Sequence, residues 1–182
     1  MARPRTIDRE QVLDAAEKVV SADGVAALSF GSVAAEAGIS KASVQSVFGN
    51  REAMIEAMLE RWTSNEQSRF EAEVGDERSS AKRIATHIRL TATEIDEVNS
   101  RTAALLAALS RSGDQSRSVT EWYKSRVGQL KVGKDLSREE RVAFLAAEGA
   151  LFLRHFIGFD FSEEVWGEIY ADLENFAAEG KL

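Results

Sequence analysis

The stretch that decides the fold reads Val33-Ala34-Ala35-Glu36-Ala37-Gly38-Ile39-Ser40-Lys41-Ala42-Ser43-Val44. Gly38 suits a tight turn between two short helices, and the small side chains of Ala34 and Ala37 would let these helices cross closely. Ser40 can cap the second helix. The apolar side chains that would hold the second helix against the first are Ile39, Val44 and Phe48. The stretch therefore predicts a helix-turn-helix.

The second helix of this pair presents small polar residues. If Val44 marks the centre of its buried face, a rotation of about 100° per residue turns Ala42 and Ser46 outward. Ser43 and Gln45 then lie on the flanks. Small side chains allow a close approach to DNA, and a glutamine can make a bidentate contact with adenine in the major groove. The helix is typical of a DNA reader, and a solvated surface is the alternative for Gln45 and Ser46.

The rest of the chain also has a helical pattern. Pro4 is the single proline, so no later residue lacks a backbone donor for a helix. Asp8 with Gln11 and Ser137 with Glu140 have capping-box spacing. We predict an all-α fold of about nine helices, with an N-terminal three-helix domain that contains the helix-turn-helix. The expected helices run from about 8 to 22, 51 to 73, 79 to 96, 100 to 110 and 115 to 130. Ser29 would cap a short helix that ends before Gly38, and Ser40 would cap the next. A further helix would follow Ser137 and end at Gly158, and Ser162 would cap the last.

Composition narrows the function classes. The 182 residues contain no cysteine, which excludes disulfides and thiolate metal sites. His87 and His155 lie far apart without a second ligand at metal spacing, and no glycine-rich phosphate loop or nucleophile motif occurs. No catalytic residue, cofactor or metal site is predicted, although an enzyme stays the competing class. The longest apolar region, 142–159, is interrupted by charged residues, and no signal segment precedes it, so we expect a cytoplasmic protein without a membrane span.

Charge favours only local contacts with DNA. The net charge is −7, and residues 1–50 carry 5 basic against 6 acidic side chains. The N-terminal part is therefore not a general binder of polyanions. Its affinity for DNA would depend on Lys41 and Arg51, and on Arg3 and Arg5 if they form an arm rather than a solvated terminus.

A second amphipathic pattern lies near the C-terminus. Apolar or small residues recur at positions 142, 145, 149, 152 and 156, a heptad-like spacing that fits either an ordinary core or a dimer interface. A reader of one DNA half-site needs a partner to span successive major grooves, which favours the interface. The residues predicted to form a homodimer interface are Leu145, Gly149, Phe156, Trp166, Tyr170 and Leu173.

The N-terminal third resembles the TetR family of bacterial regulators. The resemblance covers residues 9–59 and is carried by Val12-Leu13-Asp14-Ala15-Ala16, Gly24, Ser29, Val33-Ala34, Ala37-Gly38-Ile39-Ser40-Lys41, Phe48 and Asn50-Arg51-Glu52-Ala53-Met54. It implies a DNA-binding domain over residues 1–50 and a helical effector-binding and dimerisation domain over 51–182.

The resemblance also implies where DNA would be contacted. Ser29 would hold a phosphate at the start of its helix, and Arg51 stands where the family commonly has a phosphate-binding lysine. The remaining DNA contacts implied are Lys41, Ala42, Ser43, Gln45 and Ser46. The aromatic residue and the histidine usual before Phe48 are replaced by Gln45, Ser46 and Val47.

A small, largely apolar effector is the expected ligand of the C-terminal domain. Aromatic side chains and His87 would line its pocket, although aromatic residues at helical spacing are more often core. The pocket residues predicted are Trp62, His87, Trp122 and Phe152. The expected function is a ligand-released repressor that binds a palindromic double-stranded operator as a homodimer. A helical adaptor that keeps the fold without binding DNA is the other alternative.

Overall fold

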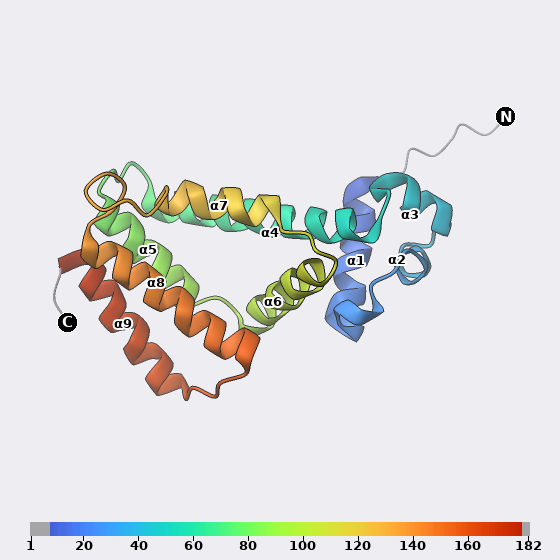
Figure 1. Cartoon of the computed structure of the whole chain (residues 1–182). Helices are drawn as coiled ribbons and strands as arrows, with labels where there is room; N and C mark the ends of the chain where they lie inside the picture. Colours follow the sequence, from blue (N-terminus) through green and yellow to red (C-terminus); the bar gives the residue numbers. More distant parts are fainter. Residues whose placement is uncertain (1–7, 180–182) are drawn as a thin grey trace. The chain divides into compact units, whose positions relative to one another are not determined.

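All regular structure in the described residues is helical. The structure is a computed structural model that describes residues 8–179, so Arg3 and Arg5 lie outside the described residues. The predicted all-α fold is confirmed (Figure 1). The nine α-helices of the described residues are α1 (Arg9–Asp23), α2 (Phe30–Ala37), α3 (Lys41–Phe48), α4 (Arg51–Val74), α5 (Ser80–Ala92), α6 (Asp96–Arg111), α7 (Arg117–Val127), α8 (Arg138–Phe152) and α9 (Glu163–Glu179). A 3-10 turn, η1 (Val25–Ala27), follows α1, and a π-helical turn, η2 (Leu153–Ile157), follows α8.

The start of α8 agrees with its prediction from the sequence, because the predicted capping residues are engaged. Ser137 and Glu140 form the predicted capping box of α8, with Glu140 N donating to Ser137 Oγ at 3.1 Å and Ser137 N to Glu140 Oε2 at 2.9 Å. The box expected between Asp8 and Gln11 is wrong, because the Asp8 carboxylate accepts from the Glu10 backbone N–H instead. A single side-chain cap is enough to begin α1.

The break expected at Asn99-Ser100 is also wrong. Both residues lie inside α6, and the chain instead leaves the helical path after Ala92. There the Glu94 carboxylate accepts a hydrogen bond from the Ile95 N–H, next to the new helix start. Asn and Ser favour helix ends in general, but tertiary packing outweighs that preference here, since Asn99 is buried.

Contacts between residues divide the chain into two compact units. The first unit contains the residues up to Trp62 together with Ala104–Ser118, and the second contains Thr63–Ala103 together with the residues from Val119 onward. Helices α4 and α6 contribute to both. The core of the first unit is built where α1 and α3 pack against α2, and its fully buried residues include Leu13, Leu28, Val33 and Val44.

Arg61 ties α1 to α4 within the first unit. Its guanidinium lies 2.6 Å from carboxylate oxygens of both Glu10 and Asp14. Burial alone would lower the pKa of Arg61, but the hydrogen bonds to these two carboxylates outweigh it and raise the pKa. The ion pairs hold α1 against α4.

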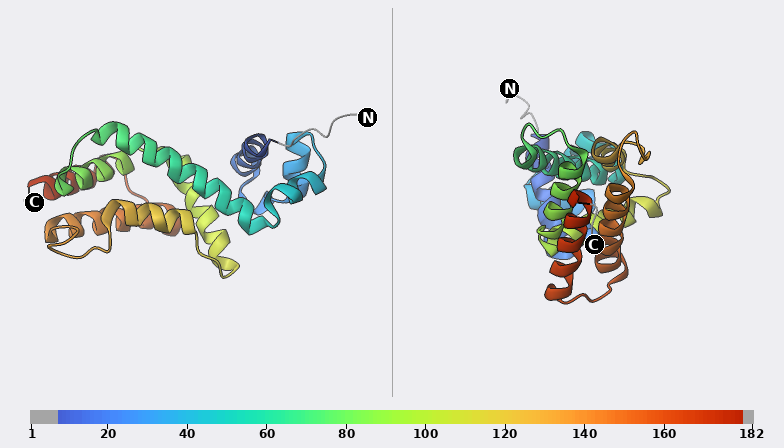
Figure 2. Two further views of the ribbon diagram at one scale, coloured as in Figure 1. Left: turned by 90° about the horizontal axis from the view of Figure 1, so that it is seen from above. Right: turned by 90° about the vertical axis from the view of Figure 1, so that its left-hand side faces the viewer.

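The core of the second unit is a layer of three helices. Helix α9 packs against both α5 and α8, as the views in Figure 2 show. Its Trp166 and Tyr170 point into this layer, where Trp166 Nε1 donates to the Ala92 carbonyl and Tyr170 Oη to the Ala147 carbonyl. None of the described helices is long and apolar enough to cross a membrane.

Candidate DNA-binding surface and effector-domain sites

Helix α3 buries and exposes the faces that its sequence predicts. Val44 is fully buried and Phe48 nearly so, whereas Ala42, Gln45 and Ser46 are exposed. Gly38 has φ 65° and closes the turn before α3, a conformation that glycine adopts without steric cost. The outer face of α3 therefore offers small and polar groups of the size that a DNA groove admits.

The serines next to this face are partly engaged within the protein. Ser40 Oγ caps α3 by accepting from Ser43 N at 3.1 Å, and Ser46 Oγ donates to the Ser43 carbonyl at 2.7 Å. Ser29 Oγ caps α2 by accepting from Ser32 N. Gln45 differs, because within the described residues no hydrogen bond holds its amide. Gln45 is thus the side chain of this face that is most available to a base edge.

Arg51 connects the start of α4 to the segment between α1 and α2. Its Nε donates to the Leu28 carbonyl at 2.9 Å and its Nη2 to the Val25 carbonyl at 2.8 Å. These bonds hold the turn η1, which leads into α2, against the start of α4. The resemblance implied a phosphate contact for this residue, and the structure adds a positioning role that the sequence did not predict.

The outer face of α8, which continues into the turn η2 at Phe156, is apolar and exposed. Leu145, Phe152 and Phe156 are 51%, 49% and 43% exposed, and Gly149 lies on the same face. The Phe152 and Phe156 rings stack at 5.1 Å between centroids. The interpretation of this stripe as ordinary core is therefore wrong for the single chain. An exposed apolar face of this kind marks an interaction surface.

Three of the α9 residues predicted at the interface have different surroundings. Trp166 and Tyr170 are 6% and 2% exposed because both rings belong to the core of the second unit. Leu173 is half-buried and packs against the same core. Little of the two aromatic side chains is left for a partner, so the exposed apolar face belongs mainly to α8.

His87 belongs to a buried polar network. Its side chain is 4% exposed, and its Nε2 lies 2.9 Å from Glu148 Oε1 on α8. Tyr123 Oη donates to the other oxygen of Glu148 at 2.5 Å. Burial, followed by the Glu148 charge, raises the pKa of Tyr123 well above its usual value. Glu148 and Tyr123 escaped the sequence analysis, since nothing in the helical spacing shows that three helices bring them together.

The aromatic residues predicted for the pocket separate into three environments. The Trp122 and His87 ring centroids lie 5.7 Å apart, so these two predicted residues are neighbours in the second unit. Trp62 is half-buried in the first unit. Phe152 faces outward on α8 and is better assigned to the exposed apolar face, because its ring stacks on Phe156 rather than entering the subunit.

A second, partly buried polar cluster lies near Trp122. Burial, the hydrogen bond that protonated Glu66 donates to Glu94 and the Glu94 charge raise the pKa of Glu66 to about 7. The guanidinium carbon of Arg126 lies 3.4 Å from the centroid of the Phe70 ring, and burial lowers the pKa of Arg126 to about 10. Neither Glu66 nor Arg126 was predictable from the sequence, because charged residues at helical spacing usually mark solvated faces.

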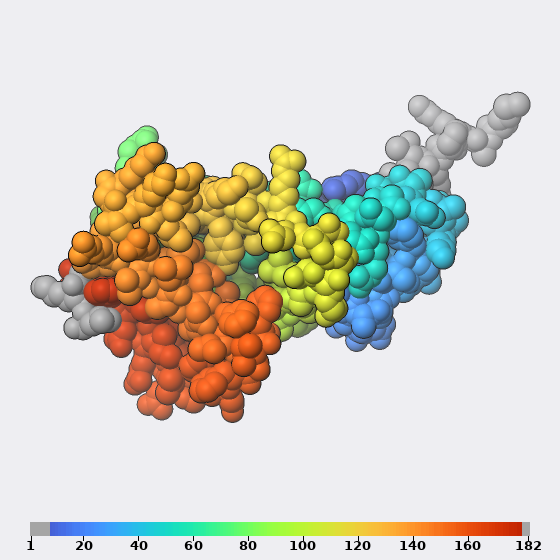
Figure 3. Space-filling view, viewed as in Figure 1, coloured from blue at the N-terminus to red at the C-terminus, as the bar shows by residue number. Residues whose placement is uncertain are grey.

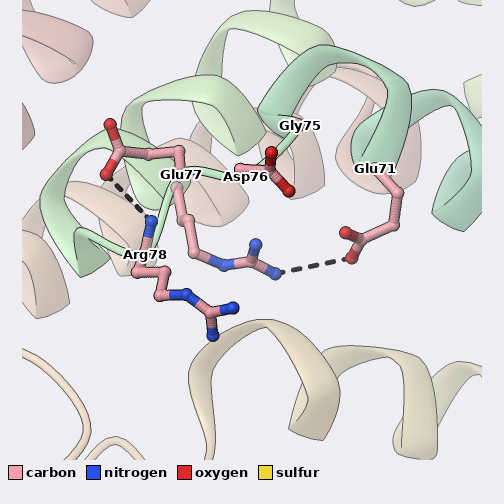
Figure 4. Close-up of a pocket in the computed structure, with 6 residues that line it drawn as sticks. Glu71, Gly75, Asp76, Glu77 and Arg78 are labelled. Atoms are coloured by element: carbon pink, nitrogen blue, oxygen red, sulfur yellow. Dashed lines mark hydrogen bonds and ion pairs between the residues drawn. The ribbon is translucent and has the colours of Figure 1, made fainter.

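One cleft of the second unit is lined mainly by charged residues. It has a volume of about 390 Å³ and lies at the turn from α4 into α5. Figure 4 shows its lining, with Arg83 Nη2 reaching Glu71 and the Glu77 carboxylate accepting from the Arg78 backbone N–H. Its walls do not match the apolar lining expected of the effector pocket. Among the described residues no cluster of three or more histidine or acidic side chains could hold a metal ion.

Comparison with known proteins identifies both parts of the chain. Residues 12–58 match the family model described as bacterial regulatory proteins, tetR family. Residues 81–178, more than half of the chain, match the model described as tetracyclin repressor-like, C-terminal domain. No curated protein sequence matches the chain.

Solved structures show the same fold. The multidrug binding protein EbrR complexed with imidazole has a TM-score of 0.68 and 21% identity, over 92% of this chain and 95% of that one. The putative regulator SCO7518 from Streptomyces coelicolor A3(2) has a TM-score of 0.66 and 18% identity, over 91% and 97% of the two chains.

The regulator FadR from Bacillus subtilis, in complex with stearoyl-CoA, has a TM-score of 0.61 and 15% identity, over 96% of this chain and all (100%) of that one. At these identities the likeness concerns the fold alone. The two family models carry the assignment, and they agree with the helix-turn-helix that presents Gln45. The chain belongs to the TetR family of bacterial transcriptional regulators, which are DNA-binding proteins rather than enzymes.

Proposed function

We propose that the protein is a cytoplasmic repressor that binds a palindromic operator as a homodimer and releases it when a small, largely apolar effector binds. In this proposal residues 1–50 bind DNA and residues 51–182 bind effector and partner. The observation that carries it is the pair of outward faces on α3 and α8, one small and polar, the other apolar.

The α3 face supports sequence-specific DNA binding. Lys41 is exposed at the N-terminus of α3 and can pair with a phosphate, while Gln45 can reach a base edge. Ala42, Ser43 and Ser46 would permit close approach to the groove. Ser29 and Arg51 would add contacts to the DNA phosphates. Arg51 would use the donors that are not bonded to the Val25 and Leu28 carbonyls.

The α8 face supports the homodimer. Two copies that join through Leu145, Gly149, Phe152 and Phe156 would remove a contiguous apolar surface from water. Gly149 carries no side chain, and a Cβ built there would meet no atom within 4 Å. The position thus leaves room for a close approach of a second helix. Leu173 would contribute at the edge.

The buried network of the second unit supports effector binding. The Trp122 and Phe144 rings both pack against the His87 ring, and Glu148 supplies an orienting polar group. An apolar effector with one polar group would fit such surroundings. Two of the similar structures were solved with small organic molecules, imidazole in EbrR and stearoyl-CoA in FadR. These two complexes are a reason to search for a small-molecule effector of this protein.

The experiment is selection of binding sites from random double-stranded DNA. Sequencing of the bound fraction should give an inverted repeat, and light scattering should show an even number of 20.0 kDa chains on each site. Candidate effectors are then screened by thermal shift and scored by the fall in affinity for the selected site.

Matched glutamine variants control this experiment. Gln45→Ala should lose the selected site, whereas Gln129→Ala, an exposed glutamine in the loop after α7, should retain it. Recovery of random sequence by the wild-type chain would refute the specific operator. An effector that stabilises the protein and leaves operator affinity unchanged would refute the release step.

A further inference from the structure

A second cleft of the second unit contains polar groups that the proposed function does not use. It has a volume of about 420 Å³ and lies beside the start of α6 and the segment that joins α8 to α9. This segment, coloured orange to red, reaches the surface in Figure 3. The residues that line the cleft are Asp96, Ser100, Arg154, His155, Gly158, Phe159, Asp160 and Phe161.

The π-helical turn η2 directs two polar side chains inward. His155 is 3% exposed and Arg154 is 13% exposed, whereas Phe156, the next residue, faces outward. π-turns widen a helix locally and often occur at functional sites. The turn therefore brings two adjacent hydrogen-bonding side chains to the wall of one cleft.

His155 has one satisfied and one unsatisfied nitrogen. Its Nδ1 lies 3.1 Å from Ser100 Oγ, while its buried Nε2 has no hydrogen-bond partner among the described residues. The nearest carboxylate oxygen, Asp96 Oδ1, is 3.8 Å away, too far for a direct hydrogen bond. When the Ser100 hydroxyl donates to Nδ1, Nε2 carries a proton that it can donate into the cleft.

Arg154 offers a second unused donor. Its Nη2 lies 2.6 Å from carboxylate oxygens of both Asp96 and Glu163, and its guanidinium lies over the Trp166 ring. Its Nη1 is buried and has no hydrogen-bond partner within the described residues. An unsatisfied buried donor is costly, so a group with acceptor oxygens is favoured next to it.

The charges around the cleft exclude an anion as the best ligand. Asp96, Asp160 and Glu163 outnumber the single cation Arg154. Burial lowers the pKa of His155, although the nearby Asp96 charge opposes this change, and the lowered pKa disfavours a positive charge on the ring. A carboxylate would meet a net negative environment, and an ammonium group would face the two N–H donors.

We infer that this cleft binds a small neutral aromatic carboxamide. The amide carbonyl would accept from His155 Nε2 and Arg154 Nη1, and the amide N–H would donate to Asp96 Oδ1. The aromatic ring would lie on Phe159, which is 55% exposed and packs against Phe161 with 4.8 Å between ring centroids. The volume is in the range of small-molecule sites.

Three aryl probes of matched size test the site on the full-length protein. Benzamide, benzoate and benzylamine differ in charge and donor pattern but share the ring. The chain has two histidines, so ring nitrogen NMR spectra of the protein labelled with ¹⁵N-histidine contain two sets of signals, and His155→Phe identifies one. Benzamide should shift the His155 Nε2 signal saturably at millimolar concentration, leave the His87 signals unchanged and bind about tenfold more tightly than either charged probe.

Two substitutions on the first turn of α6 separate charge from structure. Asp96→Asn removes one negative charge from the cleft, so it should raise the affinity for benzoate relative to benzamide. Glu97→Gln, an exposed neighbour that does not line the cleft, should leave the ratio unchanged. Absence of any His155 shift would overturn the site, as would shifts confined to His87. Equal or tighter binding of benzoate by the wild-type chain would overturn the ligand class.

Discussion

Helices α3 and α8 bury one face each and expose the other, but the exposed faces differ in chemistry. In α3 the inner face contains Val44 and Phe48, and the outer face is small and polar. In α8 the inner face is largely alanine, and the outer face carries Leu145 and Phe152. A helix stays folded in both cases because its inner face is buried. The outer face is free to bind a partner. Small polar groups on α3 fit a nucleic acid, and the apolar groups on α8 fit the second copy that we propose.

The largest effect is expected from a charge on the α8 face. Leu145→Glu would place a carboxylate against the same apolar surface of a second copy, where it has no counter-ion. The dimer dissociation constant should rise by about 100-fold or more, because both copies carry the change. Sedimentation velocity measures the constant directly. Operator affinity should fall with it.

Ile95→Glu controls for the added charge. Ile95 is 66% exposed and precedes α6, away from α8 in the sequence. This variant should stay dimeric. A Leu145→Glu protein that sediments as a dimer at micromolar concentration would show that α8 does not form the interface, and the comparison between the two faces would fail.

A smaller effect, on stability, is expected from removing the Arg51 side chain in the first unit. Arg51→Ala would lose two charge-assisted hydrogen bonds to the Val25 and Leu28 carbonyls, so the free energy of unfolding should fall by about 1.5–3 kcal/mol. Denaturant titration measures this change. Lys41→Ala is the matched cation on the exposed face of α3, and it should weaken DNA binding without a loss of stability. Equal stability of both variants would make Arg51 a phosphate contact alone.

If Gln45 on α3 contacts a base, its removal should lower the sequence specificity of DNA binding. Gln45→Ala should weaken binding to the selected operator by about 1–3 kcal/mol and change binding to random DNA little. Fluorescence anisotropy at fixed salt gives both affinities. If the two affinities fall together, Gln45 contributes to general contact and the polar face of α3 does not read sequence.

Sequence patterns predicted the α3 face well and the α8 face only in part. In α3, large apolar residues lie inside and small polar ones outside, so the position of Val44 sufficed to orient the helix. In α8 the inner face is built from Ala143, Ala147 and Ala150 around Phe144, and the larger side chains are outside. The stripe of large residues was visible, but its location depends on α5 and α9, which cover the alanine side.

Contacts between distant segments account for the remaining differences. Trp166 and Tyr170 point inward because their polar atoms reach the carbonyls of Ala92 and Ala147, which lie far away in the sequence. The buried network of His87 and the raised pKa of Glu66 depend on packing in the same way. Helical periodicity reports which residues share a face, and it does not report which polar atoms meet across helices.

The unit that carries α8 should also respond to pH through Glu66. Its pKa of about 7 in the folded chain lies above the value of 4.5 for an unperturbed glutamate, so the folded state binds more protons between these limits. Glu66 therefore adds to the free energy of unfolding at low pH. This contribution decreases as the pH rises from about 4.5 toward 7.

Glu66→Gln removes this dependence because the amide is neutral at every pH. At pH 8 the variant should be more stable than the wild type by about 1 kcal/mol, a value reduced because Glu66 is partly exposed to solvent. At pH 4 the difference in stability should vanish. Thermal unfolding across this pH range measures it. Glu60→Gln is the control variant, because Glu60 is an exposed residue of α4 in the first unit. This variant should show no such rise in stability at pH 8. A difference between wild type and Glu66→Gln that is constant with pH would contradict the assignment.

Hydrogen exchange followed by mass spectrometry, with and without the selected operator, tests the assignment of the two faces most directly. We predict that operator DNA slows exchange in peptides covering α3 and leaves α8 unchanged, whereas dilution of the free protein below its dimer dissociation constant speeds exchange in α8 and leaves α3 unchanged. Protection of α8 by DNA without protection of α3, or exchange in α8 that does not depend on protein concentration, would contradict the account.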